Sequence, residues 1–415
     1  MTGSIFVYLN KNSSDVLIGK LNVEVLRGKE NFSFEYDNSF LESKDFFLFD
    51  PDLLFFKGRQ YPSDDKPLFG IFTDSCPDRW GRQLIQRNEA LQAHIEGRSV
   101  RKLNESDYLL GIDDYSRMGA LRFKTNPDGP FLSLSNENSV PIWTSTRELE
   151  QAAMSLDDAS EADGFETSRR LKLLLQPGSS LGGARPKASV RDSSGNLWIA
   201  KFPSKTDTLD VGAWEMVVHK LAVECKLNVP MAISNKYSNN GTTFLVQRFD
   251  RTNNGNRIHF ISAMTVLGKK DGDNSDTGMS YLDIASFIQQ NSEKPREDLS
   301  ELWKRIVFSI AVSNTDDHLR NHGFLFSGKG LRLSPMYDVN PNPNGYGLSL
   351  NIDEYSNALD FDVAIDASNY YDINKDNASK LVEDIKRNVS KWRYIAQNLG
   401  ISRQSIEEMK VCFLS

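Results

Sequence analysis

The sequence predicts an α+β protein with three parts in order: a β-rich module, a mixed α/β lobe and a helical lobe. Apolar and polar residues alternate through much of 5–36, which is the pattern of half-buried strands. Strand-like apolar runs share the stretch 145–249 with helical patterns. From residue 281 onward, apolar residues recur mainly at helical spacing. We therefore expect three segments, residues 1–125, 126–252 and 253–415.

The first segment opens with three predicted strands, Ile5–Leu9, Val16–Val25 and Asn31–Tyr36. A helix is predicted from Asp78, because apolar residues then recur at helical spacing and an aspartate can cap the first turn. A short helix around Ser106–Leu110 and a strand around Gly119–Phe123 follow. Residues Thr125–Val140 are rich in Pro, Gly, Asn and Ser, so we expect a junction or exposed loop there.

The second segment contains both kinds of element. Its predicted helices are Ser145–Ser155, Phe165–Leu175 and Ala213–Cys225, and its predicted strands are Ala188–Val190, Leu197–Lys201 and Thr243–Phe249. The third segment is mostly helical, with predicted helices at Tyr281–Gln290, Asp298–Asn314, Lys380–Leu399 and Ser402–Val411. A loop-rich insert, Leu319–Tyr355, interrupts this helical segment.

Composition narrows the class of protein. Hydrophobic residues make up 39% and charged residues 25%, which is typical of globular proteins. The net charge of −7 argues against direct, non-specific binding of nucleic acid. The cysteines, Cys76, Cys225 and Cys412, lie far apart without metal-ligand spacing, which fits a reducing compartment. No secretory signal and no bilayer-spanning apolar run is visible, so we expect a cytoplasmic protein without a membrane partner.

The most informative segment is SNTDDHLRNHGFLF, residues 313–326, which follows a predicted apolar helix. Asp316 and Asn321 have the five-residue separation of the catalytic aspartate and the metal-binding asparagine in protein-kinase catalytic loops. Asp338, in SPMYDVNP, offers a further carboxylate oxygen for Mg²⁺. Spacing alone leaves the alternative of an ordinary polar loop open, since Asp and Asn are common in loops.

The same segment allows a zinc interpretation. His318 and His322 are four residues apart and would share one face of a helix. Gly323 discourages such a helix, and no third His or Cys stands nearby. A metal-dependent hydrolase built on these two histidines is therefore the weaker alternative.

A second candidate segment is the glycine-rich PGSSLGGARPKASV, residues 177–190. Gly178, Gly182 and Gly183 permit the close backbone approach that binding of phosphate oxygens requires, and Lys187 adds a cation. The segment matches neither of the common phosphate-binding glycine motifs, so an ordinary glycine-rich turn is the alternative.

A buried cation is predicted in the next strand, WIAKFP, residues 198–203. Lys201 stands there among apolar residues, and a buried ammonium needs an anionic partner such as a nucleotide phosphate. Glu215, on the following helix, is either a partner for Lys201 or a solvated helix charge.

The strand FLVQRFDR, residues 244–251, ends in charged residues. In a two-lobed kinase such a strand leads into the hinge, whose backbone groups meet the adenine of ATP. An edge strand with a solvated end explains the same pattern.

Together these segments resemble the HipA-family serine/threonine kinases, the toxins of HipBA-type toxin–antitoxin pairs. The resemblance rests on GSSLGGARPKA, WIAKFP, VQRFDR, NTDDHLRNHGF and SPMYDVNP in this order. FGIFTDSCPDRWGRQLIQR (69–87) and YLLGIDDYSRMGALRF (108–123) look like the N-terminal module of the family. The resemblance covers nearly the whole chain and implies a two-lobed protein-kinase-like fold with an all-helical C-terminal lobe.

The resemblance also implies a role for individual residues. Asp316 takes the place of the catalytic aspartate, and Asn321 and Asp338 take the places of the metal and phosphate ligands. Ser180, or its neighbour Ser179, matches a loop serine that family members autophosphorylate. The remaining expected nucleotide contacts are Gly182, Gly183, Ala184, Arg185, Lys187, Lys201, Gln247, Phe249 and His318, with Gln247 standing where the family often has Glu.

We therefore expect an ATP- and Mg²⁺-dependent serine/threonine kinase. The resemblance implies a protein acceptor such as an aminoacyl-tRNA synthetase. It also implies a HipB-like helix-turn-helix antitoxin as partner, with DNA contacted only through that antitoxin. A catalytically weak, nucleotide-binding co-repressor is the alternative, but a decayed kinase would usually have lost one of Lys201, Asp316, Asn321 and Asp338, and all four are present.

Overall fold

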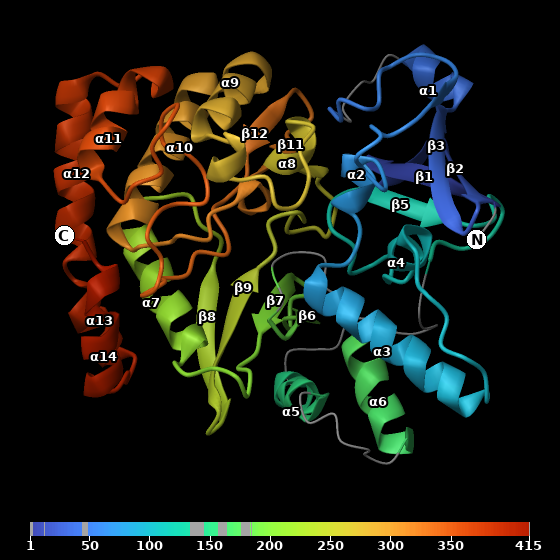
Figure 1. The fold of residues 1–415 in the computed structure, drawn as a ribbon, viewed down its shortest axis with the longest axis horizontal. Helices are drawn as coiled ribbons and strands as arrows, with labels where there is room; N and C mark the ends of the chain where they lie inside the picture. The colour runs from blue at the N-terminus through green and yellow to red at the C-terminus, as the bar shows by residue number, and fades with distance from the viewer. Residues whose placement is uncertain are drawn as a thin grey trace. The chain divides into compact units, whose positions relative to one another are not determined.

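The structure, a computed structural model, describes residues 3–11, 13–43, 49–132, 145–156, 164–175, 183 and 185–414. The chain divides into two compact units, Met1–Thr206 with Gln247–Ile261 and Asp207–Val246 with Ser262–Ser415. Both units contain helices and strands, so the predicted mixed α/β character is confirmed (Figure 1). The two-lobed arrangement and the division at residues 125 and 252 stay predictions. The predicted all-helical character of residues 253–415 is wrong, because strands lie at Gly323–Phe326 and Leu331–Leu333. Residues 247–261 belong to the N-terminal unit, a long-range association that the order of the sequence does not reveal.

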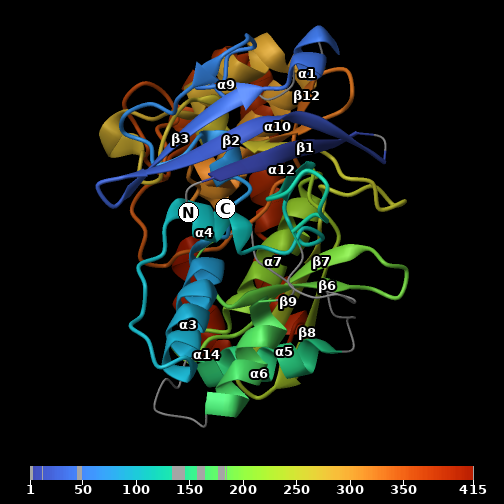
Figure 2. The same ribbon diagram turned by 90° about the vertical axis from the view of Figure 1, so that its right-hand side faces the viewer.

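An antiparallel five-stranded sheet, in the order β4-β3-β2-β1-β5, begins the N-terminal unit (β1, β2 and β3 are labelled in Figure 2). Its alternating sequence places Ile5, Val7 and Leu9 on the buried side of β1. Arg27 and Gly28 join β2 to β3 with φ of 52° and 77°, as a two-residue type I′ turn requires. The three strands predicted from alternation are confirmed. The strands are β1 (Gly3–Lys11), β2 (Ser14–Leu26), β3 (Lys29–Tyr36), β4 (Arg59–Gln60) and β5 (Leu121–Lys124).

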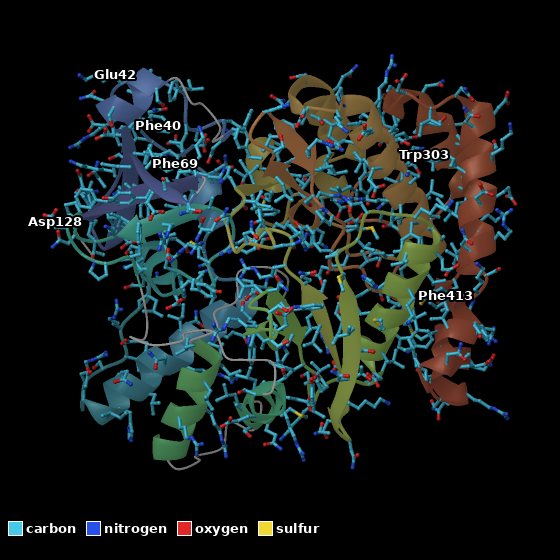
Figure 3. All side chains as sticks on the ribbon, turned by 180° about the vertical axis from the view of Figure 1, so that it is seen from behind. Phe40, Glu42, Phe69, Asp128, Trp303 and Phe413 are labelled. Carbon is cyan, nitrogen blue, oxygen red and sulfur yellow. The ribbon has the colours of Figure 1, made fainter. Side chains whose placement is uncertain are left out.

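Aromatic side chains form the core beneath this sheet. The ring of Phe34 lies 6.5 Å from that of Phe69 and 5.5 Å from that of Phe72, both near the short helix α2 (Gly70–Thr73). Phe40, on α1 (Asn38–Ser43), stacks on Tyr36 at 5.9 Å (Figure 3). All five rings are buried, and each stabilises the module by about 1.5–3 kcal/mol.

The rest of the N-terminal unit is helical except for one hairpin. As predicted, Asp78 caps α3, and its carboxylate accepts a hydrogen bond from the backbone nitrogen of Gly81 at 2.8 Å. Helix α3 packs against α6, which packs against α5 (Figures 1 and 2). The Trp80 indole donates a hydrogen bond to the Lys187 carbonyl, which links α3 to β6. These elements are α3 (Arg79–Ile95), α4 (Glu105–Leu110), α5 (Thr146–Leu156), α6 (Gly164–Leu175), β6 (Lys187–Arg191) and β7 (Leu197–Lys201).

The C-terminal unit begins with α7 (Val211–Glu224) packed on the antiparallel hairpin of β8 (Ala232–Ser238) and β9 (Gly241–Gln247). Asp210 caps α7 and also accepts a hydrogen bond from the backbone nitrogen of Thr242 at 2.9 Å. A Cβ on Gly212 would lie 2.0 Å from the Thr242 carbonyl oxygen, so only glycine allows this close packing. Strand β8 was not predicted, because it is half-buried along most of its length and lacks clear alternation.

Helix α10 (Pro295–Ala311) is the central element of the C-terminal unit. It buries Leu302, Trp303 and Ile306, and the Trp303 indole donates a hydrogen bond to the Ala364 carbonyl at 2.8 Å (Figure 3). In the described parts of the chain, no helix is both long and apolar enough to cross a bilayer. Strand β10 (Phe260–Ser262) stands in the sequence where the N-terminal unit ends and the C-terminal unit resumes. The other elements of the C-terminal unit are α8 (Ala263–Val266), α9 (Tyr281–Asn291), β11 (Gly323–Phe326), β12 (Leu331–Leu333), α11 (Phe361–Asp366), α12 (Lys375–Val389), α13 (Trp392–Asn398) and α14 (Arg403–Met409).

The single helix predicted at Lys380–Leu399 is wrong. The structure contains two helices there, since α12 ends at Val389 and α13 begins at Trp392. The Trp392 ring stacks on Phe413 at 4.3 Å, and its centroid lies 6.2 Å from that of Trp214 (Phe413 is labelled in Figure 3). Burial of Trp392 in this aromatic cluster is a tertiary effect that helical periodicity does not report.

Candidate functional site

The predicted catalytic loop starts at the buried C-terminal end of α10. Ser313 adopts a left-handed φ of 50°. Its backbone nitrogen donates to the Ile310 carbonyl at 3.2 Å, and that of Asn314 donates to the Ser309 carbonyl at 2.9 Å. This is the Schellman ending of a helix, in which glycine is the usual left-handed residue. The loop therefore leaves α10 in a fixed direction, with a non-glycine residue held in an uncommon conformation.

The two adjacent aspartates of this loop have different environments. Asp316 is exposed, whereas only 5% of Asp317 is exposed. The Tyr281 hydroxyl donates a hydrogen bond to Asp317 at 2.7 Å, and Nε2 of His322 lies 3.1 Å from Asp317 Oδ1. Burial alone would raise the pKa of Asp317, but His322 and Tyr281 outweigh it and hold the pKa below its usual value. Asp317 is therefore a buried structural carboxylate, whereas the Asp316 residue is exposed to solvent.

Asn321 closes the loop on itself. Residues Leu319–Asn321 form one 3₁₀ turn, and the backbone nitrogen of Asn321 donates to the His318 carbonyl at 2.8 Å. The side-chain nitrogen of Asn321 donates to the Asp316 carbonyl at 2.9 Å. Because the amide nitrogen is used inside the loop, the amide oxygen is the atom that can bind a metal ion.

The segment that carries Asp338 lies beside this loop. The Tyr337 hydroxyl donates a hydrogen bond to the Arg320 carbonyl at 2.7 Å, and the backbone nitrogen of Asn340 donates to Asn314 Oδ1 at 3.2 Å. Asp338 has a left-handed φ of 57°, an uncommon conformation that is often found at functional sites. The structure thus brings the segments of Asn321 and Asp338 together through bonds between their neighbours.

These residues fit a magnesium ion chemically. Mg²⁺ prefers oxygen ligands, and Asn321 and Asp338 offer an amide oxygen and a carboxylate. Two further atoms of the same loops, Asn340 Oδ1 and His318 Nδ1, are buried without a hydrogen-bond partner. Buried polar atoms normally have partners, so this region has polar atoms that a ligand or its water could satisfy.

Nothing in the structure supports the zinc interpretation. His318 and His322 flank a 3₁₀ turn and do not share one face of an α-helix. His322 instead contacts Asp317. Among the residues that the structure describes, no cluster of three His, Cys, Asp or Glu side chains has the arrangement of a metal site.

The predicted phosphate cations occupy one hairpin of the N-terminal unit. Lys187 and Lys201 are directly paired across β6 and β7, and they are 2% and 7% exposed. Lys187 Nζ lies 2.8 Å from Asp78 Oδ2 and donates a hydrogen bond to the Gly183 carbonyl, also at 2.8 Å. Asp78 therefore neutralises one of two lysines that would otherwise repel each other. The phosphate role of Lys187 stays a prediction, and its structural role as a partner of Asp78 was missed.

The other residues of the predicted phosphate loop are only partly described. Arg185 donates a hydrogen bond to the Phe202 carbonyl at 3.3 Å. Outside the described residues lie Gly178, Ser179, Ser180, Gly182 and Ala184. In the C-terminal unit, Glu215 on α7 is only 4% exposed, so its interpretation as a solvated helix charge is wrong. Its pairing with Lys201 stays a prediction.

The predicted hinge segment is not the solvated end of a strand. Arg248 is 5% exposed and Asp250 is fully buried. Asp250 accepts hydrogen bonds from Arg248 Nη2 at 2.7 Å, from Arg251 Nη1 at 2.5 Å and from the backbone nitrogen of Gly119 at 2.8 Å. Burial alone would raise the pKa of Asp250, but Arg248 and Arg251 hold it far below its usual value.

Arg248 and Arg251 also connect the predicted hinge segment to the N-terminal module through hydrogen bonds. Arg248 Nη1 donates to the Ser116 carbonyl, and Arg251 Nη2 donates to the Arg117 carbonyl at 2.9 Å. Gln247, the predicted adenine contact, is half-buried and borders a polar cavity of about 260 Å³. The ring of Phe249 lies 6.0 Å from that of Phe260. Sequence reasoning missed this ionic network, because its partners lie about 130 residues apart.

Comparison with known proteins identifies the family. Residues 179–393, more than half of the chain, match the HipA-like C-terminal domain family, and the chain therefore belongs to it. This confirms the resemblance drawn from the motifs.

Two relatives carry kinase names. A "Putative kinase" of Haemophilus influenzae is 26% identical over 195 residues, which cover 42% of this chain and 57% of that protein. "Putative kinase Y4mE" of Sinorhizobium fredii is 30% identical over 148 residues, covering 34% of this chain and 33% of that protein. The chain thus matches about a third to somewhat over half of the length of these relatives.

A solved structure shares the fold. It is a chain of the complex of HipA, HipB and operator DNA from the Shewanella oneidensis MR-1 toxin–antitoxin system. The TM-score is 0.66 at 16% sequence identity, and the match covers 98% of this chain and 94% of that one. At this identity the match shows a common fold.

Proposed function

We propose that this protein is an ATP-dependent kinase of the HipA type that phosphorylates serine or threonine in a protein acceptor. The observation that carries the proposal is the loop pair of the C-terminal unit. There the exposed Asp316 shares a rigid loop with Asn321, and hydrogen bonds hold the Asp338 segment alongside. Family membership and the kinase names of the relatives support the same activity.

Each residue has a distinct task in this proposal. The Asp316 carboxylate accepts a hydrogen bond from the acceptor hydroxyl, orients it and takes its proton. Asn321 and Asp338 hold Mg²⁺, which when bound neutralises negative charge on the phosphates. Lys201 stands where the family resemblance implies a strand lysine, and in this proposal it binds a nucleotide phosphate.

Family likeness also suggests partners and regulation. We propose a HipB-like helix-turn-helix antitoxin as binding partner and contact with DNA through that antitoxin, as in the related complex of HipA, HipB and operator DNA. We propose autophosphorylation at Ser180 or Ser179, and an aminoacyl-tRNA synthetase as one class of acceptor. After incubation with Mg-ATP, mass spectrometry of the peptide 177–187 should find phosphate on one of these two serines. An unmodified peptide from an active enzyme would exclude the autophosphorylation.

The kinase proposal is tested by substitution of the predicted catalytic aspartate. Asp316→Ala should bind Mg-ADP with a Kd within about twofold of the parent, measured by calorimetry. Its transfer of labelled γ-phosphate should fall at least about 100-fold, because the general base is gone. Asn321→Ala, in contrast to Asp316→Ala, should weaken the binding of Mg-ADP. Asp376→Ala, at an exposed position in the first turn of α12, is the matched control and should behave like the parent. Phosphate transfer retained by Asp316→Ala would contradict the assignment.

A further inference from the structure

Residues 342–349 are held against the start of the predicted catalytic loop. The backbone nitrogen of Asn342 donates to the Ser313 carbonyl at 3.0 Å, and its side-chain nitrogen donates to Thr315 Oγ1 at 2.8 Å. The Ser349 hydroxyl donates to the Thr315 carbonyl at 2.9 Å. Both ends of this segment are therefore bonded to residues that immediately precede Asp316.

Tyr346, inside this segment, lies between two closely packed glycines, Gly345 and Gly347. A Cβ on Gly345 would lie 2.2 Å from Thr315 Oγ1, so the Gly345 backbone packs directly on the Thr315 side chain. A Cβ on Gly347 would lie 2.9 Å from Asn357 Nδ2, and the backbone nitrogen of the next residue donates to the Asn357 carbonyl. The Tyr346 side chain itself is 97% exposed. The backbone beside Tyr346 is thus packed on both sides, while almost none of the residue's own surface is buried.

The position of Tyr346 limits the kind of molecule that it can bind. Single exposed aromatic residues are common on protein surfaces, so exposure alone carries no conclusion. Tyr346, however, directly follows Gly345, whose backbone packs on Thr315, the neighbour of Asp316. A ring that is 97% exposed projects from the surface and does not line a concave small-molecule pocket. Only a macromolecule that supplies its own pocket can cover it, and tyrosine is enriched among residues that dominate such interfaces.

We propose that Tyr346 is an acceptor-docking residue. Its ring inserts into an apolar pocket on the surface of a protein acceptor and so favours proteins that carry a serine or threonine near this pocket. The molecule that binds the Tyr346 ring is a folded protein rather than a nucleotide or a small alcohol. The inference rests on the proposed kinase function and adds the place at which the acceptor is recognised.

The test compares the transfer of phosphate to protein with the hydrolysis of ATP. The full chain is incubated with labelled Mg-ATP and a phosphatase-treated bacterial soluble proteome, at one low and one tenfold higher protein concentration. Hydrolysis of ATP is measured without the proteome. The variants are Tyr346→Ala, Tyr346→Phe, which keeps the ring, and Tyr394→Ala, which removes another exposed tyrosine, on α13.

Tyr346→Ala should lower protein labelling about tenfold at the low proteome concentration, and the deficit should shrink at the higher one. ATP hydrolysis should stay within about twofold, and Tyr346→Phe and Tyr394→Ala should label like the parent. Labelling by Tyr346→Ala that equals the parent's would overturn the inference, and so would a parallel loss of labelling and hydrolysis. A parent that hydrolyses ATP but labels no protein would also overturn it. A parent with neither activity would instead overturn the proposed kinase function.

Discussion

Asp250 provides a quantitative test of how the predicted hinge segment is held. Its carboxylate is fully buried and lies within 2.7 Å of Arg248 Nη2 and 2.5 Å of Arg251 Nη1. The side chains of these arginines are only 2% and 7% exposed, so Asp250→Ala leaves two guanidinium groups buried without their shared anion. Removing one partner of such a buried pair typically costs about 3–5 kcal/mol. A domain is stabilised by only about 5–15 kcal/mol, so the expected loss is large.

Hydrogen exchange can measure the loss of stability within the N-terminal unit, which contains Asp250. Because the chain has two units, a single unfolding transition is not a safe measure. Exchange of peptides that cover 113–119 and 247–252 should speed up in Asp250→Ala by an amount that corresponds to about 3–5 kcal/mol. Asp128→Ala, at an exposed position of the same unit, is the matched control and should change exchange by less than about 0.5 kcal/mol. A loss below about 1 kcal/mol in Asp250→Ala would refute the reasoning.

The same residue predicts a pH dependence with a definite sign. The arginines hold the pKa of Asp250 below its value in the unfolded chain, which is about 3.9. The ionised carboxylate therefore stabilises the fold above about pH 4, and this contribution is lost as the pH falls further. The stability difference between the parent and Asp250→Asn should be largest at neutral pH and shrink below about pH 4. A difference that stays constant down to pH 3 would contradict an ionic role for Asp250.

Three further predictions concern other packed sites. Burial raises the pKa of Asp50 to about 6, so the folded state binds an extra proton between about pH 4 and 6. Stability should therefore fall by up to about 3 kcal/mol as the pH rises through this range, and this slope should be absent in Asp50→Asn, measured by hydrogen exchange in peptides of the N-terminal unit. Gly345→Ala places a Cβ against Thr315 and should lower phosphate transfer about 10- to 100-fold through misplacement of the loop before Asp316, measured with labelled ATP. Lys187→Met leaves the Asp78 carboxylate buried without its cation and should destabilise the N-terminal unit by about 3–5 kcal/mol in hydrogen exchange.

Each of these predictions has a control. For Asp50→Asn, an unchanged pH slope in the variant would show that other groups cause the dependence. For Gly345→Ala, Gly3→Ala is the matched change, since a Cβ there meets nothing within 4 Å. For Lys187→Met, the double variant with Asp78→Asn should be less destabilised than the single variant, because it leaves no unpaired charge. A double variant that loses as much as the sum of both single changes would disprove the pairing.

Much of the fold and the candidate site follows from local rules that the sequence states directly. Strict alternation predicted the first three strands, because side chains in a strand point to opposite faces in turn. Asp78 predicted the start of α3, since its carboxylate accepts from a backbone nitrogen three residues on. The spacing of Asp316 and Asn321 likewise lies within one loop, where a hydrogen bond joins the Asn321 side chain to the Asp316 carbonyl. Over such short separations along the chain, few other local conformations compete with the predicted one.

Only the tertiary structure decided which charged side chains are buried and which are exposed to solvent. The spacing to Asn321 selected Asp316 from the sequence, but it did not predict that Asp317 is buried in contact with Tyr281 and His322 while Asp316 is exposed. The sequence left open whether the charges at the end of 244–251 are solvated, whereas in the structure Asp250 accepts a hydrogen bond from the Gly119 backbone nitrogen, 131 residues earlier in the chain. Periodicity and spacing describe neighbours along the chain, whereas the environment of a charged group depends on segments that folding brings from far away. The sequence by itself therefore determined many of the elements and the candidate residues, whereas long-range packing determined what surrounds each of them and where α12 ends and α13 begins.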